Sequence, residues 1–468
     1  MKNRKINKVA VIGSGIMGSG IACHFANIGV EVLLLDIVPS SLTEMESSKG
    51  QTLNDTAVRN RIVNENLTKS IKSNPAPLYH PKFANRITTG NLEDDLVRLA
   101  EVDWIIEVVV ERLDIKQQIF ERLESHRKPG TLITSNTSGI PIALMNEGRS
   151  QDFQKHFAVT HFFNPPRYLK LFEVVPGPNC NQEVTDFLMD YGTRFLGKQS
   201  VLAKDTPAFI GNRIGIFCIQ SLFHQVKDMG LTIEEIDKLT GPVIGRPKSA
   251  TFRTVDVVGL DTLVHVANGL HEHCAKDERR EVFKLPDFIA TMMEKQWLGS
   301  KSGQGFYKKS KNSDGSSEIL TLDLDTMDYR KRKRAQFATL EKTKSIDLLE
   351  DRYAVLADGT DKAGAFYRKN FGELFAYVQY RIPEISDELY RIDHSMKGGF
   401  GWTNGTFEIY DAIGVQKGIE LIKEAGHAVA DWVSELATSE NAHFYTLHKG
   451  TRCYYDIPAK KHTVIPGQ

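Results

Sequence analysis

The sequence predicts an α/β fold, in which a doubly wound, mostly parallel sheet is followed by a duplicated, all-helical C-terminal region. Up to about residue 205, short apolar runs typical of buried strands alternate with helix-like stretches. Beyond that point helical patterns dominate, and one segment recurs. Residues 234–261 and 389–415 share an Ile-Asp pair, a glycine-rich turn, and Phe, Asp and Gly at one spacing, which favours duplication of a domain over convergent loops.

The alternating pattern defines the expected elements in order. The strand-like runs are 9–12, 30–36, 87–90, 103–110, 131–135 and 157–163. A long helix is expected over 206–230, with Pro207 at its start. The domains predicted on this basis are 1–205 for the sheet domain with an inserted helical hairpin, 206–310 for a first helical domain, 311–340 for a linker, 341–440 for a second helical copy and 441–468 for a tail.

Composition excludes several classes of protein. The 468 residues are 41% hydrophobic and 25% charged, which is typical of globular chains. Lys plus Arg and Asp plus Glu both number 59, so neither a nucleic-acid partner nor a membrane partner is expected. The five cysteines are scattered, which indicates reduced thiols, no cysteine metal site and a cytoplasmic location.

A glycine-rich motif follows the first strand. Gly13-Ser14-Gly15-Ile16-Met17-Gly18 has the G-x-G-x-x-G spacing, opens a helix and is followed by a strand that ends at Asp36. This context predicts a Rossmann-type dinucleotide site with Gly13, Gly15, Ile16, Met17 and Gly18 around the pyrophosphate, whereas a turn without a ligand is the alternative. Asp36 would bind the adenosine ribose and repel a 2′-phosphate, so NAD is expected as the cofactor.

A histidine is the expected base for oxidising a hydroxyl group. His161 lies in one of two strand-like runs that flank Asn164-Pro165-Pro166, and a hairpin centred near Arg167 would place it opposite Glu173. A carboxylate against an imidazole fixes its tautomer and raises its basicity. A purely structural His–Glu pair is the equal alternative.

At this point the chain resembles the L-3-hydroxyacyl-CoA dehydrogenases. The motifs that carry the resemblance occur in that family's order: the glycine motif, VVVERLDIK (108–116), SNTSGI (135–140), HFFNP (161–165), KDTPAFIGNR (204–213) and KSGQGFY (301–307). The layout is most similar to the dehydrogenase portion of bacterial fused chains that also carry an enoyl-CoA hydratase domain. Such a domain is therefore a candidate fused or associated partner, and the family also suggests a homodimer.

The resemblance implies a role for each matching residue. His161 matches the catalytic base and Glu173 its partner, while Asn164 and Asn212 match asparagines that position the reacting oxygen and the thioester. Ser138 matches a serine that contacts substrate and nicotinamide. The positions that match the nicotinamide side and the cofactor edge are Glu111, Lys116 and Lys301. Each of these residues also has a non-functional interpretation, as a helix cap, an ordinary polar residue of a helix or a solvated surface charge.

The resemblance also shows departures. The turn of the first helical domain usually carries an acid after its phenylalanine, but here Arg253 follows Phe252, whereas Glu408 follows Phe407 in the second copy. The second copy lacks a counterpart of Phe209 to Arg213, so one catalytic site is expected. A polar segment after Asp36 resembles the family's CoA-binding helical hairpin, with Arg61 and Lys69 as candidate phosphate contacts.

These observations predict NAD-dependent oxidation of L-3-hydroxyacyl-CoA to 3-oxoacyl-CoA, as in fatty-acid β-oxidation. Two alternatives stay open: a dehydrogenase of a small 3-hydroxy acid without CoA, and a non-catalytic NAD-binding module. The intact set Ser138, His161, Asn164, Glu173 and Asn212 speaks against the second. Competition by free CoA would separate the first from the main hypothesis.

Overall fold

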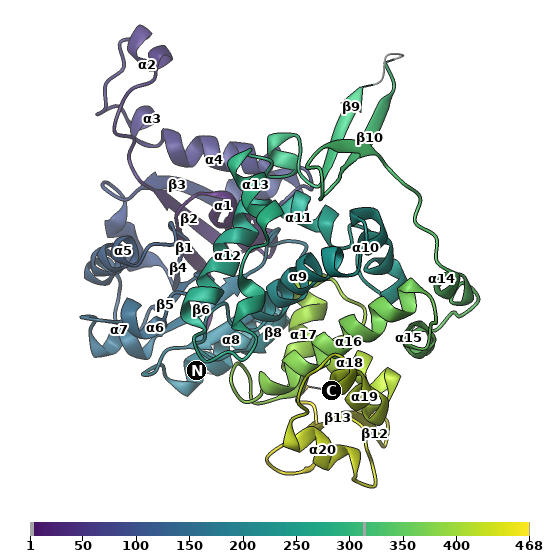
Figure 1. Ribbon diagram of the computed structural model, residues 1–468. Helices are drawn as coiled ribbons and strands as arrows, with labels where there is room; N and C mark the ends of the chain where they lie inside the picture. Colours follow the sequence, from purple (N-terminus) through teal and green to yellow (C-terminus); the bar gives the residue numbers. More distant parts are fainter. Residues whose placement is uncertain (1–3, 312–314, 468) are drawn as a thin grey trace. The chain divides into compact units, whose positions relative to one another are not determined.

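The computed structural model describes residues 4–311 and 315–467. The chain divides into two compact units, one ending at Phe209 and the other beginning at Ile210. The first unit contains the parallel sheet, and the second is mainly helical (Figure 1). No helix in these two stretches is both long and apolar enough to cross a membrane.

The first unit is built on an eight-stranded sheet in the order β3-β2-β1-β4-β5-β6-β7-β8. Every neighbouring pair is parallel except β6 and β7, which are antiparallel. The expected doubly wound, mostly parallel sheet is confirmed. Its strands are β1 (Lys8–Ile12), β2 (Glu31–Asp36), β3 (Ile87–Asn91), β4 (Trp104–Glu107), β5 (Leu132–Ser135), β6 (Phe157–Phe162), β7 (Leu171–Pro176) and β8 (Gln199–Leu202).

The strand order determines where a ligand can bind. Strand β1 lies between β2 and β4. The chain runs from β1 to β2 and β3 on one side of β1, and then crosses back to β4 on the other side. The carboxyl ends of β1 and β4 therefore meet where the connections diverge, which is the usual ligand crevice of such sheets. Long helices alternate with the strands, namely α1 (Ile16–Asn27), α5 (Leu113–His126) and α8 (Gln182–Arg194).

The connection from β2 to β3 contains the segment expected to form a helical hairpin. It forms α2 (Glu44–Ser48), α3 (Thr56–Arg59), α4 (Arg61–Ile71) and the 3₁₀ helix η1 (Pro81–Arg86). Helix α4 packs on α1 and buries Val63 and Leu67 while its other faces remain polar. The remaining short helices of this unit are η2 (Leu96–Glu101), α6 (Ile142–Met145) and α7 (Gln151–Lys155).

The second unit contains two copies of one arrangement, residues 210–331 and 362–464. The first copy comprises α9 (Gly211–Asp228), α10 (Ile233–Leu239), η3 (Pro242–Ile244), α11 (Phe252–Val258), α12 (Leu260–His273), η4 (Arg280–Phe283), α13 (Asp287–Glu294), η5 (Ser300–Ser302), β9 (Tyr307–Lys311), β10 (Ser317–Leu322) and β11 (Tyr329–Lys331). The second comprises α16 (Lys362–Tyr380), α17 (Leu389–Phe400), α18 (Thr406–Ile413), α19 (Val415–Glu424), α20 (Asp431–Ala437), β12 (Tyr445–His448), β13 (Thr451–Asp456) and β14 (Lys461–Val464). Helices α14 (Ala338–Lys342) and α15 (Leu349–Ala357) connect the copies.

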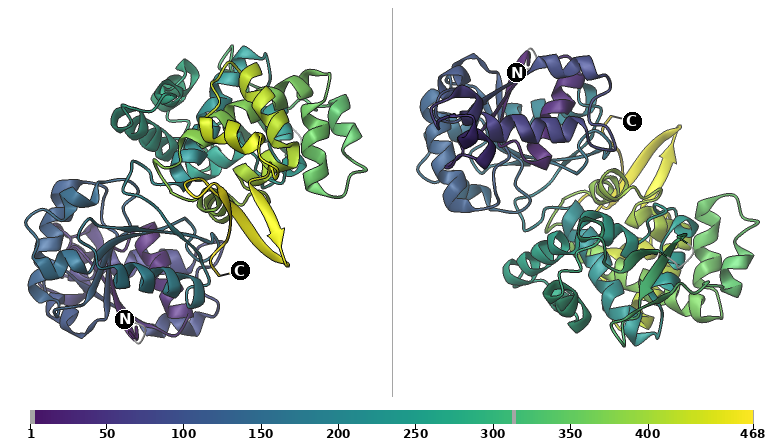
Figure 2. Two further views of the ribbon diagram at one scale, coloured as in Figure 1. Left: turned by 90° about the horizontal axis from the view of Figure 1, so that it is seen from below. Right: turned by 90° about the horizontal axis from the view of Figure 1, so that it is seen from above.

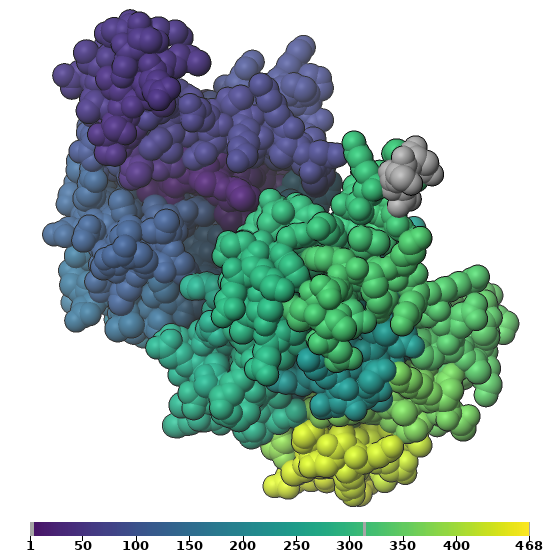
Figure 3. Space-filling view, turned by 45° about the horizontal axis from the view of Figure 1, so that its top comes forward, coloured from purple at the N-terminus to yellow at the C-terminus, as the bar shows by residue number. Residues whose placement is uncertain are grey.

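Two aspartates at matching positions show the duplication directly. Asp237 accepts hydrogen bonds from the backbone amide of Phe252 at 2.7 Å and from the hydroxyl of Tyr307 at 2.7 Å. Asp393 accepts the same pair of bonds from Phe407 at 2.9 Å and Tyr445 at 2.8 Å. The copies also pack on each other, because α9 contacts both α16 and α17 (Figure 2). Figure 3 shows teal segments of the first copy and light-green and yellow segments of the second on one surface of this unit.

Three expectations about the second unit need correction. The region is mainly helical but includes two small antiparallel sheets, β9–β11 and β12–β14. Strands β10 and β11 therefore lie within the expected linker 311–340, and β12–β14 lie within the expected tail 441–468. Residues 312–314 and 468 are outside the described part. The lysines of β9 hide the apolar alternation by which strands are recognised.

The long helix expected from Pro207 begins later, at Gly211. Ala208 and Phe209 have φ angles of +62° and +51°, which belong to the left-handed region and cannot continue a right-handed helix. The chain therefore changes direction at these two residues, where the first unit ends.

Candidate active site

The glycine motif forms a tight turn between β1 and α1. Gly13 has a φ of +100°, and a Cβ there would lie 2.6 Å from the carbonyl oxygen of Val108. A Cβ on Gly18 would lie 1.8 Å from the carbonyl oxygen of Gly13, so only glycine lets the helix approach the turn this closely. Gly15 is different, because a Cβ there would meet no atom within 4 Å. The open space at Gly15 is where a pyrophosphate would contact the backbone.

Asp36 ends β2 beside this turn. Its carboxylate accepts hydrogen bonds from the backbone amide of Ser14 at 2.6 Å and from the Ser14 hydroxyl. Asn66 of α4 donates to the same hydroxyl at 3.0 Å. The carboxylate is thus fixed next to the glycine turn, at the position where it can bind ribose hydroxyls. Turn, open space and carboxylate together fit NAD.

A buried ion pair connects the end of strand β4 to helix α5. The ammonium group of Lys116 on α5 lies 2.8 Å and 3.0 Å from the carboxylate oxygens of Glu107. Lys116 is 1% exposed and Glu107 is fully buried. Ser135, paired with Glu107 across β4 and β5, donates its hydroxyl to the same carboxylate at 2.5 Å. Lys116 is therefore held inside the carboxyl edge of the sheet.

Glu111 and Ser138 form the exposed side of this cluster. Glu111 accepts bonds from the Thr137 hydroxyl at 2.6 Å and from the Ser138 amide and hydroxyl at 2.8 Å and 3.1 Å. Its other oxygen lies 3.3 Å from Lys116. Burial raises the pKa of Glu111, but Lys116, Thr137 and Ser138 outweigh it and hold the pKa below its usual value. The structure thus brings Glu111, Lys116 and Ser138 together as a charged, hydrogen-bonded group.

His161 and Glu173 face each other across β6 and β7, which is the register that the sequence predicted. His161 Nδ1 lies 2.7 Å from Glu173 Oε2. Glu173 is fully buried, and the His161 ring is packed by Phe163 and Phe209, with centroids 4.6 Å and 5.8 Å away. The carboxylate occupies Nδ1, so Nε2 is the nitrogen that can exchange a proton with a substrate.

Comparison with known proteins assigns the chain to a family. Residues 8–206 match the sequence model of the 3-hydroxyacyl-CoA dehydrogenase NAD binding domain, and residues 209–309 match that of the 3-hydroxyacyl-CoA dehydrogenase C-terminal domain. A probable 3-hydroxyacyl-CoA dehydrogenase of Deinococcus radiodurans is 43% identical over 68% of this chain and 87% of its own length. This chain belongs to the 3-hydroxyacyl-CoA dehydrogenase family.

Two further matches extend over the second copy. A probable 3-hydroxyacyl-CoA dehydrogenase of Bacillus subtilis is 45% identical over 97% of this chain, which spans 57% of that relative's length. The crystal structure of 3-hydroxybutyryl-CoA dehydrogenase from Escherichia coli has a TM-score of 0.64 at 22% identity. It covers 93% of this chain and 98% of that one, and therefore shows that the two chains share a fold. The family's NAD-binding domain makes NAD the cofactor, as predicted.

Other residues expected at this site make fewer contacts with it. Asn164 is exposed in the loop after β6, and Lys69 is exposed on α4. Arg61 is ion-paired with Glu46 and donates to the carbonyl oxygen of Ser41 at 3.0 Å, so its charge is already compensated locally. Their roles toward CoA and substrate stay predictions.

Asn212 and Lys301 belong to the second unit of the chain. Asn212 is partly buried in the first turn of α9, and Lys301, within η5, is ion-paired with Asp261 of α12. The side chain of Lys301 is 47% exposed. Nothing in the fold of the second unit alone assigns either residue to the dinucleotide site, and both roles stay predictions.

Sequence reasoning missed three residues that support the site. Glu107 holds Lys116, and its place as the one acid in the otherwise apolar run 104–110 was the available signal. Asn136 accepts the backbone amide of Phe162 at 2.8 Å, next to His161. Lys198 donates to the carbonyl oxygens of Pro166 and Leu169 in the loop after Asn164, and burial lowers the pKa of Lys198 to about 8. Asn136 and Lys198 could not be recognised from the sequence, because their contacts are with residues far away along the chain.

Proposed function

We propose that this chain oxidises the L-3-hydroxyl group of an acyl-CoA to the 3-oxo group with NAD, as in fatty-acid β-oxidation. The observation that carries the proposal is the buried His161–Glu173 pair in the unit that contains the glycine turn. NAD, when bound, supplies the hydride acceptor. The names of the relatives support the choice of substrate class.

Each candidate site residue has its own role in the proposed reaction. His161 takes the hydroxyl proton on Nε2, and Glu173 stabilises the resulting imidazolium through Nδ1–H. Ser138 is held at Glu111 by its backbone amide, and its hydroxyl, which donates to Glu111 in this structure, can turn to donate a hydrogen bond to the reacting oxygen. Lys116 places a positive charge behind Glu111 and fixes that carboxylate. Asn164 and Asn212 would orient the oxygen and the thioester.

The decisive experiment measures NADH consumption with acetoacetyl-CoA, beside NADH binding by fluorescence. We expect robust turnover by the wild type and a loss of about 10²- to 10⁴-fold in His161→Ala, with NADH affinity preserved. His126→Ala, which removes an exposed histidine from the end of α5, is the matched control and keeps full activity. A wild-type protein that binds NADH and leaves acetoacetyl-CoA unchanged would refute the proposal.

A second arm tests the CoA part of the substrate. Free CoA should compete with acetoacetyl-CoA, because a substrate site for an acyl-CoA must bind the nucleotide portion. Turnover of a small 3-hydroxy acid that free CoA does not inhibit would show the non-CoA alternative instead. Arg61→Gln and Lys69→Gln are expected to raise KM for acetoacetyl-CoA while leaving kcat unchanged.

The partners are part of the proposal. One relative over 86% of this chain is named as a fatty acid oxidation complex trifunctional enzyme, from Rickettsia felis, and this chain spans 53% of it. We infer that an enoyl-CoA hydratase activity, fused or associated, supplies the 3-hydroxyacyl-CoA. We also infer a homodimer, which light scattering of the purified chain would measure.

A further inference from the structure

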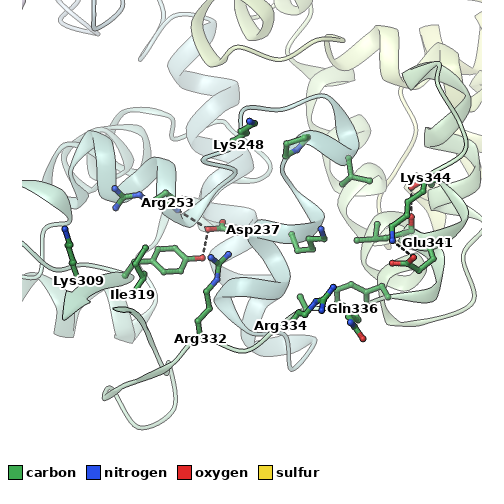
Figure 4. A pocket seen from close by; sticks show the side chains of 18 of the residues that line it. Asp237, Lys248, Arg253, Lys309, Ile319, Arg332, Arg334, Gln336, Glu341 and Lys344 are labelled. Carbon is green, nitrogen blue, oxygen red and sulfur yellow. Dashed lines mark hydrogen bonds and ion pairs between the residues drawn. The ribbon is translucent and has the colours of Figure 1, made fainter. Parts of the chain in front are cut away.

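The second unit contains a large cavity that is lined by cationic side chains. Its volume is about 1200 Å³, which is sufficient for a nucleotide-sized ligand. It lies among α10, α11, the β9–β10 hairpin and the segment leading into α14 and α15 (Figure 4). The basic residues of the lining are Lys238, Lys248, Arg253, Lys309, Arg332, Arg334, Lys344 and Arg352, against the acids Asp237 and Glu341.

Most of these charges are not neutralised locally. Glu341 is ion-paired with Lys344, and Asp237 accepts bonds from the Tyr307 hydroxyl and from backbone amides. No ion pair connects Lys238, Lys248, Lys309, Arg332 or Arg334 to another residue in the described stretches. The chain as a whole has no net charge, so this excess of positive charge is a local feature.

The duplication shows how one of these charges arose. In the second copy Glu408 follows Phe407, caps α18 and is ion-paired with Lys397 and Arg452. In the first copy the matching position is Arg253, which lines the cavity and whose nearest ion-pair contact, with Asp256, is long at 3.9 Å. A carboxylate that neutralises cations in one copy is thus replaced by an additional cation in the other.

The cations are spread around the cavity. Figure 4 shows Arg253 and Lys309 on one side and Lys344 on the opposite side, with Arg332 and Arg334 between them. A single small anion could contact only part of this set, whereas a ligand with separated phosphate groups could contact most of it. Apolar side chains also line the cavity, namely Pro242, Val243, Ile319, Phe337 and Leu340.

We propose that this cavity binds a small molecule that carries several phosphate groups together with a ring or apolar portion, the class to which ATP and coenzyme A belong. The cations bind the phosphates, and the apolar side chains contact the remainder of the ligand. About half of the lining residues, including Arg332, Arg334 and Lys344, lie beyond the matched C-terminal domain, which ends at residue 309. The inference does not depend on the dehydrogenase reaction.

The test is calorimetric titration of ATP and, separately, CoA into the full chain saturated with NADH, so that the dinucleotide turn is filled. We expect binding of at least one ligand, weakened by about tenfold or more in Arg332→Gln/Arg334→Gln. The control Lys276→Gln/Lys423→Gln removes the same charge from exposed positions of this unit outside the cavity and leaves binding unchanged. The ligand whose affinity falls in the cavity variant, ATP or CoA, is the one that binds in the cavity.

Other outcomes would overturn the proposal. These are no binding of either ligand, equal binding by the cavity variant, or displacement of ATP by inorganic phosphate at the same concentration, which would mean non-specific anion binding. Tighter binding of poly-glutamate, lost in the cavity variant, would indicate an acidic macromolecule instead. If Arg332→Gln/Arg334→Gln does not fold, Lys248→Gln/Lys309→Gln provides the same comparison. Turnover of acetoacetyl-CoA, measured in parallel, tests the catalytic proposal separately.

Discussion

The ammonium group of Lys116 lies between two carboxylates, within 3.0 Å of both oxygens of Glu107 and 3.3 Å from Glu111. Glu107 and Lys116 are buried, whereas Glu111 continues outward to Ser138. Removing one member of a buried ion pair leaves the other uncompensated in a poorly solvated place. The pair therefore couples the stability of the first unit to the position of its candidate catalytic residues.

We expect Glu107→Gln to destabilise the first unit by about 3 kcal/mol, because Lys116 would retain only its longer contact with Glu111. The double variant Glu107→Gln/Lys116→Met should recover part of the loss, since no buried charge would remain unpaired. Urea unfolding followed by circular dichroism measures both. Glu101→Gln, which breaks the exposed pair with Lys8, is the control and should have little effect. A double variant as unstable as the sum of its parts would contradict this account.

Glu173→Gln should lower kcat by about 10²-fold, because the neutral amide cannot stabilise a positive charge on His161. The affinity for NADH and the KM for acetoacetyl-CoA should change little, since neither depends on that charge. A purely structural pair would give the opposite pattern: an altered unfolding midpoint with unchanged kcat in the folded fraction. Steady-state kinetics beside thermal unfolding distinguishes the two.

Two glycine substitutions should have different effects. Gly18→Ala would place a Cβ 1.8 Å from the carbonyl oxygen of Gly13, so the turn must shift, at a cost of about 1–3 kcal/mol. Gly15→Ala meets no neighbouring atom, so the protein should keep its stability and lose NADH affinity because the methyl group enters the phosphate space. Fluorescence titration of NADH and thermal unfolding check this. Unchanged NADH affinity in Gly15→Ala would argue against the placement of the pyrophosphate.

His24 should make stability depend on pH. Burial, assisted by the nearby charge of Lys198, lowers the pKa of His24 to about 4 from an ordinary value of 6.5. Between these two pH values the unfolded chain binds a proton that the folded protein does not bind, so stability falls as the pH decreases from 6.5 to 4, by up to about 3 kcal/mol.

His24→Gln retains a donor for the Leu196 carbonyl oxygen, which His24 Nε2 contacts at 3.0 Å, and removes the titration. We expect a flatter dependence of the unfolding free energy on pH between 6.5 and 4 in this variant than in the wild type. His126→Gln, at an exposed histidine, should behave as the wild type does. Parallel curves for wild type and His24→Gln would show that another group titrates in this range.

The sequence by itself determined the elements whose signals are local. Strands β1, β2 and β4 each contain a short apolar run, and the glycine spacing around Gly13 and Gly18 reflects backbone contacts that only glycine permits. The pairing of His161 with Glu173 was also accessible, because these residues lie symmetrically about Arg167 in two strand-like runs, and an antiparallel hairpin centred there makes them face each other. The duplication was visible because Phe252, Asp256 and Gly259 in the first copy have the same spacing as Phe407, Asp411 and Gly414 in the second.

Only the tertiary structure decided which charges meet. Glu107 and Lys116 lie on a strand and the following helix, and Ser135 reaches the same carboxylate from another strand, so sequence spacing could not show the cluster. The positive φ angles of Ala208 and Phe209, which delay α9, follow from the path of the chain between units. The cationic cavity likewise arises because a hairpin, two helices and a connecting segment converge, and each contributes charges that appear solvated when read along the chain.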